Sequence, residues 1–255
     1  MTSSVMPRRS ASRPRRRRPS ACWRCARAAP CAWRAAPRWR CSTWRSIGPD
    51  YLPGHAHADT LSFELSLHGR EVIVNRGTSV YGEGPRRQLE RSTAAHSTVQ
   101  LGTQDSSEVW AGFRVGRRAR PLEVSIEGWQ IAAAHDGYAH LPGRPLHRRC
   151  WRFESDHALV AEDRIEPAAA TREHPALARF HLAPGLRCEP AGPAAPRTWT
   201  VLEGERPLAQ AEVAAGGKAG LESWQHARRF GELVPAVTLA VSLQDGRAEV
   251  RWTWL

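Results

Sequence analysis

The 255-residue sequence has no run of 18 or more apolar residues, so it predicts no transmembrane helix. It also has no glycine-rich nucleotide-binding loop, no GxSxG nucleophile elbow and no internal repeat of fixed length. Only two cysteines, Cys150 and Cys188, lie beyond residue 46, which is too few to indicate a disulfide framework. Nothing here points to a nucleotide-binding protein, a serine hydrolase of that type or a disulfide-stabilised secreted domain.

Acidic residues are absent from the first 46 positions, which contain thirteen Arg. The other 24 basic residues of the chain face all 25 acidic ones, so residues 47–255 are almost neutral. The net charge of +12 therefore belongs to one terminal segment. Because polyanion affinity needs clustered positive charge, the body of the protein is not expected to bind nucleic acid.

Residues 1–46 are rich in Arg, Pro, Ala, Cys and Trp and have no helical or strand periodicity, so they predict a disordered segment. A basic nucleic-acid-binding arm and a targeting peptide are alternatives, although no apolar stretch follows the charges as an export signal requires. The composition is also that of a GC-rich coding region translated out of frame. A zinc site is not favoured, because a second CxxC and any His are missing; the thiols are those of Cys22, Cys25, Cys31 and Cys41.

Residues 47–255 form one predicted domain, built from short strands. Leu61, Phe63, Leu65 and Leu67 alternate with polar residues, and a turn at 68–69 leads into an apolar second strand at 72–74. Further strand patterns recur every 8–15 residues without any long stretch of 3.6-residue period. We therefore predict an all-β fold, an antiparallel β-sandwich.

The stretch Gly54–Asp59 carries the candidate chemistry. In an extended chain His55, His57 and Asp59 point to the same side, where two imidazoles and a carboxylate can hold a metal or transfer protons. His96 begins a later strand and could join them. The alternative is that these histidines only hydrogen-bond the neighbouring loops. Nearby arginines could bind carboxylate or sulfate groups, or simply form a solvated loop face; they are Arg76, Arg86, Arg87 and Arg91.

Several motifs in order resemble the C-terminal domain of heparinase II/III-type polysaccharide lyases. They are YLPGHAHADTLSFEL (51–65), VNRGTSVY (74–81), RSTAAHSTV (91–99), EVWAGFRVGRRA (108–119), HDGY (135–138), HRR (147–149) and RFHLAPG (179–185). The resemblance is strong over 47–190 and weaker over 191–255.

This resemblance implies a C-terminal sandwich that, with an N-terminal α/α toroid, cleaves uronate-containing polysaccharides by β-elimination. It implies that His55 contributes to catalysis and that a structural zinc is bound by the positions of His57, Asn75 and His96. Asn75 stands where the family usually has Asp, so metal affinity should be weaker or the metal different. Ser97 replaces the Asn that usually follows the later His. Four further positions are expected to support the site, Arg76, Tyr81 and Arg91 by binding the anionic polysaccharide and Asp59 by orienting its neighbours.

Residues 1–46 cannot form the toroid, since they are too short and contain no Tyr or helical pattern. The expectation is therefore the sandwich part of a lyase, incomplete and weakly active or inactive by itself. A non-catalytic carbohydrate-binding sandwich and a stand-alone metal-dependent hydrolase are the alternatives. Heparan sulfate, alginate and bacterial exopolysaccharide are possible substrates. Intact family members work in the periplasm, in the cell envelope or outside the cell, but this chain shows no export signal.

Overall fold

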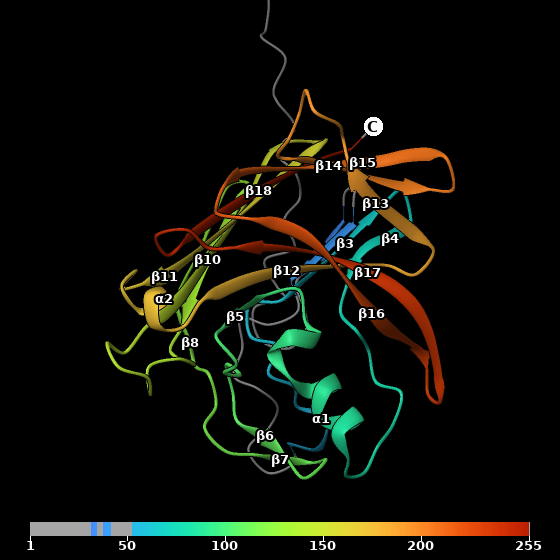
Figure 1. Cartoon of the computed structure of the whole chain (residues 1–255). Helices are drawn as coiled ribbons and strands as arrows, with labels where there is room; N and C mark the ends of the chain where they lie inside the picture. Colours follow the sequence, from blue (N-terminus) through green and yellow to red (C-terminus); the bar gives the residue numbers. More distant parts are fainter. Residues whose placement is uncertain (1–31, 35–37, 42–52, 255) are drawn as a thin grey trace, which may run out of the picture.

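The computed structural model describes residues 32–34, 38–41 and 53–254, and most of these residues lie in two antiparallel β-sheets (Figure 1). The first sheet has the order β1-β2-β3-β4-β12-β17-β16, with β5 also paired to β12. The second has the order β13-β14-β15-β18-β11-β10-β9-β8, and β6 and β7 form a separate two-stranded sheet. The predicted antiparallel β-sandwich is confirmed, since the two sheets stack around one core.

The first sheet consists of β1 (Ala32–Arg34), β2 (Arg38–Cys41), β3 (Phe63–Leu67), β4 (Arg70–Val74), β5 (Val99–Leu101), β12 (Ala176–Leu182), β16 (Ala219–Arg229) and β17 (Glu232–Ser242). The second consists of β8 (Pro121–Glu127), β9 (Gln130–His135), β10 (Leu146–Ser155), β11 (Ala158–Glu166), β13 (Leu186–Pro190), β14 (Thr198–Glu203), β15 (Arg206–Ala215) and β18 (Arg247–Trp254). The remaining elements are β6 (Val109–Trp110), β7 (Arg114–Val115), α1 (Pro85–Arg91), α2 (Ala170–Glu173) and two 3₁₀ turns, η2 (Pro53–His55) and η3 (Thr93–Ala95).

Aromatic side chains from both sheets join the two layers. Phe63 and Phe180 of the first sheet are buried and meet edge to face, with ring centroids 6.1 Å apart. Phe63 also meets Trp151 at 6.3 Å, and Phe180 meets Trp252 at 5.5 Å, both from the second sheet. Offset and edge-to-face contacts of this kind are the favoured geometry for aromatic pairs.

The predicted first hairpin is present, with β3 and β4 joined by His68 and Gly69. Both turn residues have positive φ, 50° and 83°. This combination is the one that matches the twist of a two-residue hairpin and explains the glycine. Burial alternates along β3 as the sequence pattern predicts.

Two of the strands differ from the sequence expectation. β1 and β2 lie within residues 1–46, where no strand pattern is visible, and β2 pairs with β3 along its whole length. Backbone pairing uses donors and acceptors that every non-proline residue carries, so such short strands need no alternating pattern. Cys22 and Cys25 lie outside the described residues. None of the helices in the described part of the chain is long and apolar enough to cross a membrane.

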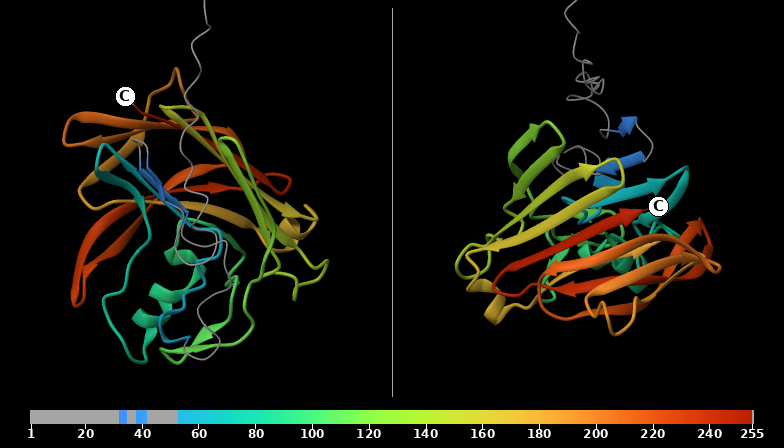
Figure 2. Two further views of the ribbon diagram at one scale, coloured as in Figure 1. Left: turned by 180° about the vertical axis from the view of Figure 1, so that it is seen from behind. Right: turned by 90° about the horizontal axis from the view of Figure 1, so that it is seen from above.

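Helix α1 and the β6–β7 hairpin gather at one end of the sandwich, as two views show (Figures 1 and 2). There the backbone of the loop at 75–84 comes close to β16 and to the β6–β7 turn. Gly77 has φ +76°, and an added Cβ would come within 2.7 Å of the Ala227 carbonyl oxygen of β16. Gly112 has φ +68° and is packed against the Gly82 carbonyl in the same way. Glycine at these two positions lets loops from distant parts of the chain meet.

Candidate functional site

His55 and Tyr81 form an exposed pair at this end of the sandwich. His55 ends η2, and Tyr81 comes from the loop at 75–84. The Tyr81 hydroxyl oxygen lies 3.4 Å from His55 Nδ1, and the two rings meet edge to face at 5.7 Å. An imidazole and a phenol in reach of each other and of solvent can take up and release protons at a bound ligand.

His57 and His96, the predicted metal ligands, also come together. His57 Nδ1 lies 3.1 Å from His96 Nε2. His96 Nδ1 is 2.8 Å from the Ser92 carbonyl, which can only accept, so His96 carries its proton on Nδ1. His96 Nε2 is then an acceptor, and His57 Nδ1 must donate to it. Burial lowers the pKa of His57 to about 2 and that of His96 to about 4, so both rings are neutral at pH 7.

Arg87 completes this chain of hydrogen bonds from the other side. Its Nη1 lies 3.3 Å from His57 Nε2, the nitrogen left as an acceptor, and 3.4 Å from Thr78 Oγ1. Its other nitrogens donate to the carbonyls of Gly112 and Gly54, each at 3.2 Å. The side chain is only 1% exposed. The direction of donation thus runs from Arg87 to His57, to His96 and on to the Ser92 carbonyl.

The buried face of α1 is polar, which explains how Arg87 reaches the site. Arg87, Glu90 and Arg91 lie three and four residues apart and point inward, whereas Leu89 is 49% exposed. Glu90 accepts hydrogen bonds from the Ser79 backbone N–H at 3.0 Å and from the Ser79 hydroxyl. Helix α1 therefore fixes the loop that carries Thr78 and Tyr81.

Two of the predicted polysaccharide-binding residues make contacts within the protein. Arg91 is fully buried and donates to the backbone carbonyls of Ala56, Trp110 and Arg114 at 3.0–3.1 Å. Its guanidinium holds the histidine loop against the β6–β7 hairpin. Arg76 packs its guanidinium over the ring of Trp224, 5.2 Å from the centroid. Of the three predicted residues, Tyr81 alone lies beside His55.

Asn75 and Asp59 lie near the histidines without completing a cluster of charged ligands. Asn75 Oδ1 accepts the Ser97 backbone N–H at 2.9 Å, and its Nδ2 donates to Glu64 at 3.2 Å. Burial raises the pKa of Asp59 to about 7. Across the described residues, no group of three or more His, Cys, Asp or Glu side chains is arranged to hold a metal ion. The groups that could ligate a metal here are thus two imidazoles and one neutral amide, and a guanidinium lies beside them.

An exposed aromatic cluster borders the His55–Tyr81 pair, and the sequence analysis missed it. Tyr81 stacks on Phe113 at 6.2 Å and meets Phe230 at 5.5 Å. The three rings are 49%, 46% and 64% exposed, respectively, and come from the loop at 75–84, the β6–β7 turn and the β16–β17 turn. Three separate loop tips supply them, so no sequence spacing could have predicted the cluster.

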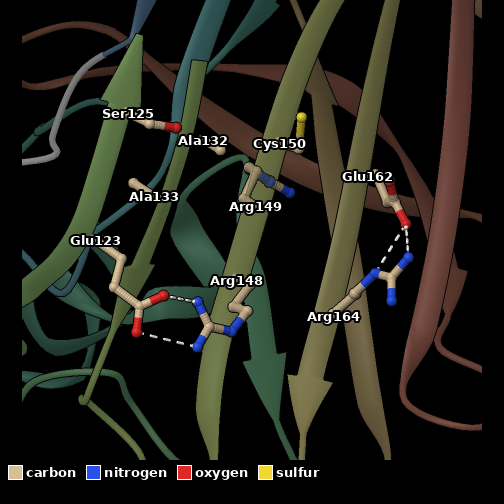
Figure 3. A pocket seen from close by; sticks show the side chains of 9 residues that line it. All are labelled: Glu123, Ser125, Ala132, Ala133, Arg148, Arg149, Cys150, Glu162 and Arg164. Atoms are coloured by element: carbon tan, nitrogen blue, oxygen red, sulfur yellow. Dashed lines mark hydrogen bonds and ion pairs between the residues drawn. The ribbon is translucent and has the colours of Figure 1, made fainter. Parts of the chain in front are cut away.

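A pocket of about 290 Å³ lies elsewhere, on the outer face of the second sheet (Figure 3). Two of its arginines are paired with glutamates of the same face: Arg148 contacts Glu123 and Glu166, and Arg164 lies 2.7 Å from Glu162. Because these guanidinium charges are already neutralised, the pocket is not a good candidate for an anionic ligand.

Comparison with solved structures gives the fold class. A heparinase III described as the BT4657 gene product has TM-score 0.64 at 14% identity, over 86% of this chain and 32% of that one. Heparan sulfate lyase HepC from Pedobacter heparinus has TM-score 0.60 at 14% identity, over 86% and 33%. The present chain thus has the fold of a part of these enzymes and spans about a third of their length.

The sequence gives the family. The family model described as "Heparinase II/III-like, C-terminal" matches residues 44–253. The chain therefore belongs to this family, and the match includes residues 191–253, where the resemblance in the sequence is weakest. No curated protein sequence matches.

Proposed function

We propose that this chain is the sandwich part of a polysaccharide lyase that cleaves uronate-containing glycans by β-elimination. The observation that carries the proposal is the exposed His55–Tyr81 pair, with hydroxyl and imidazole 3.4 Å apart. The reaction needs two proton transfers, one from C5 of the uronate and one to O4, the leaving group. Breaking the C5–H bond supplies the electrons of the new C4–C5 double bond, and the C4–O4 electron pair leaves with O4. His55 and Tyr81 are the residues proposed to move these protons.

Neutralising the uronate carboxylate makes the C5 proton acidic enough to remove. In the described residues, the guanidinium groups of Arg87 and Arg91 are buried on backbone carbonyls and are not available for this task. We therefore propose that the carboxylate is bound by a second unit, such as the toroid that the resemblance implies. The chain alone should then bind glycan and turn it over slowly.

The test is to incubate the full chain with alginate, heparan sulfate and unsulfated polyuronates and to analyse the products by ultraviolet absorbance and mass spectrometry. An unsaturated product, lighter by one water than the hydrolysis product, is expected at a low rate. His55→Ala should reduce this rate about 100-fold or more, a typical effect of losing one acid–base group. His157→Ala, at an exposed position on another loop, is the matched control. Saturated products would favour a metal-dependent hydrolase, and binding without turnover would favour a carbohydrate-binding module.

The aromatic cluster predicts how the glycan is held. Sugar rings stack on exposed aromatic faces, and the cluster of Tyr81, Phe113 and Phe230 continues directly from His55. Phe230→Ala should weaken glycan binding about 3–10-fold, since an aromatic contact contributes about 0.5–1.5 kcal/mol. Affinity electrophoresis or calorimetry measures this. Trp129→Ala, which removes an aromatic ring 41% exposed on the distant β8–β9 turn, should leave binding unchanged. Equal losses in both variants would contradict the assignment.

A further inference from the structure

We propose that in this chain the guanidinium of Arg87, and not a metal ion, is the cation that organises His57 and His96. This inference concerns how the site is held together and does not depend on the lyase reaction. It rests on which nitrogen of each ring carries its proton and on what surrounds the third position, Asn75.

The proton positions oppose metal binding between the two rings. A divalent metal held by His57 Nδ1 and His96 Nε2 requires both nitrogens to be unprotonated. His96 meets this requirement because its proton lies on Nδ1, toward the Ser92 carbonyl. His57 does not, because its Nε2 faces the Arg87 donor at 3.3 Å, and its proton must therefore lie on Nδ1. Moving that proton to Nε2 would set it against the Arg87 donor, and the Thr78 Oγ1 that lies 3.5 Å from Nε2 already accepts from Arg87.

Arg87 cannot easily turn away to relieve this conflict. Its guanidinium also donates to the carbonyls of Gly54 and Gly112 and to Thr78, and it is 1% exposed. Leaving would strand the buried Gly112 carbonyl, which costs about 1–3 kcal/mol, and would also remove the donor from the half-buried Gly54 and Thr78 acceptors. The guanidinium also places a positive charge beside any ion bound at His57.

The third position lacks the negative charge that would offset this repulsion. Asn75 is a neutral amide, and both ends of it are engaged, with the Ser97 backbone N–H and with Glu64. Two imidazoles and one amide are a weak set for zinc, whose protein sites use thiolates, imidazoles and carboxylates. Arg87 already supplies, through its hydrogen bonds to three other groups, the rigidity that a structural metal gives.

The decisive measurement uses the unmodified chain, labelled with ¹⁵N at histidine. Long-range ¹H–¹⁵N spectra report which ring nitrogen is protonated. Both His57 and His96 are expected to carry the proton on Nδ1, with or without added zinc. Chain purified from zinc-supplemented medium without chelators should contain well below one zinc per molecule, and EDTA should leave its thermal midpoint unchanged. One bound zinc per chain, or a His57 proton on Nε2, would overturn the proposal.

Variants test the same point from the opposite direction. The double variant Asn75→Asp/Arg87→Met restores a carboxylate and removes the competing cation, so its thermal midpoint should rise with added zinc, as binding to the native state requires. Arg86→Met is the matched control, because Arg86 is exposed and pairs with Glu90 on the same helix. Its thermal midpoint should not rise with added zinc. A double variant that folds and still ignores zinc would count against the proposal. If it does not fold, the spectra of the unmodified chain still decide.

Discussion

Lowering the pH from 7.5 to 5.0 is expected to reduce the free energy of unfolding of this domain by about 5 kcal/mol. The main reason is that four buried histidines stay neutral in the native state, and His147, His140 and His226, whose pKa burial also lowers, act in the same direction. Burial lowers the pKa of His57 to about 2 and of His96 to about 4, and it holds the pKa of His135 and His181 well below the ordinary value. The unfolded chain takes up protons as the pH falls through about 6.5, and the native state does not.

The direction and size of this change in the free energy of unfolding follow from the difference in proton uptake between the two states. Each neutral histidine lowers the free energy of unfolding by about 2 kcal/mol between pH 7.5 and 5.0, because only the unfolded state binds the additional proton. Asp59 acts in the opposite direction: burial raises its pKa to about 7, so the native state gains a proton there and recovers about 2.5 kcal/mol. Asp105, whose pKa burial also raises, adds to this recovery. The effect of the histidines is larger than that of the carboxyls, so the domain becomes less stable as the pH is lowered.

Urea denaturation at several pH values measures the effect. His181→Gln should reduce the pH dependence by about 2 kcal/mol over this interval, since it removes one titrating group. Its neighbours, Thr238 Oγ1 at 2.6 Å and the Ala94 carbonyl at 3.0 Å, can still hydrogen-bond to the amide. His157→Gln, at an exposed position, is the control and should change nothing. A stability that stays constant or rises toward pH 5.0 would contradict the prediction.

The first hairpin and the pairing of His57 with His96 show what the sequence could predict. Alternation along 61–67 and the turn at 68–69 are local signals, and the structure follows them. The pairing of the two histidines came instead from the family resemblance, because they lie 39 residues apart. The extended conformation assumed for 54–59 is interrupted at its start, since His55 closes a 3₁₀ turn that begins at Pro53. Burial still alternates from 55 to 59, where His55, His57 and Asp59 are more exposed than Ala56 and Ala58.

The role of Arg87 could not be predicted, because α1 reverses the usual amphipathic pattern. Hydrophobic periodicity identifies helices that bury apolar side chains. Here the buried face carries Arg87, Glu90 and Arg91, while Leu89 points to solvent. From the sequence, these arginines were therefore expected either to bind anionic groups or to form a solvated loop face. Only the carbonyls that these arginines meet show that they hold the site together.

A buried polar network inside the sandwich was equally invisible in the sequence. The Gly137 backbone N–H donates to His135 Nδ1 at 3.0 Å, which places the His135 proton on Nε2. That nitrogen lies 3.1 Å from His147 Nδ1, and His147 Nε2 donates to Asp163 at 2.7 Å. The network ends at Arg149, and the four charged or titratable side chains come from three strands of the second sheet. No local spacing joins them.

Arg149→Met should destabilise the domain by about 3–5 kcal/mol, because it leaves the buried carboxylate of Asp163 without its cation. Arg149 donates to both oxygens of Asp163, at 2.7 and 2.9 Å, and both side chains are about 1% exposed. It also donates to the carbonyls of Leu61 at 2.9 Å and Ser97 at 2.6 Å, which lie in the segments that lead from the histidine site into β3 and β5 of the first sheet. The loss should therefore loosen the 96–98 segment as well as weaken the core.

A double-mutant cycle separates the pair from the carbonyl contacts. Asp163→Asn alone and Arg149→Met alone should each be costly, and the double variant should be less destabilised than the two single effects added, because no unpaired charge remains. Urea denaturation gives the three free energies of unfolding. The Arg149 contacts to Leu61 and Ser97 are lost in the single and the double variant alike, so they cancel in the coupling term. Hydrogen exchange at the Ser97 amide reports them separately and should speed up in both variants that lack Arg149. Strictly additive effects would mean that Arg149 acts through the two carbonyls, as a tie between the sheets, and not through its charge on Asp163.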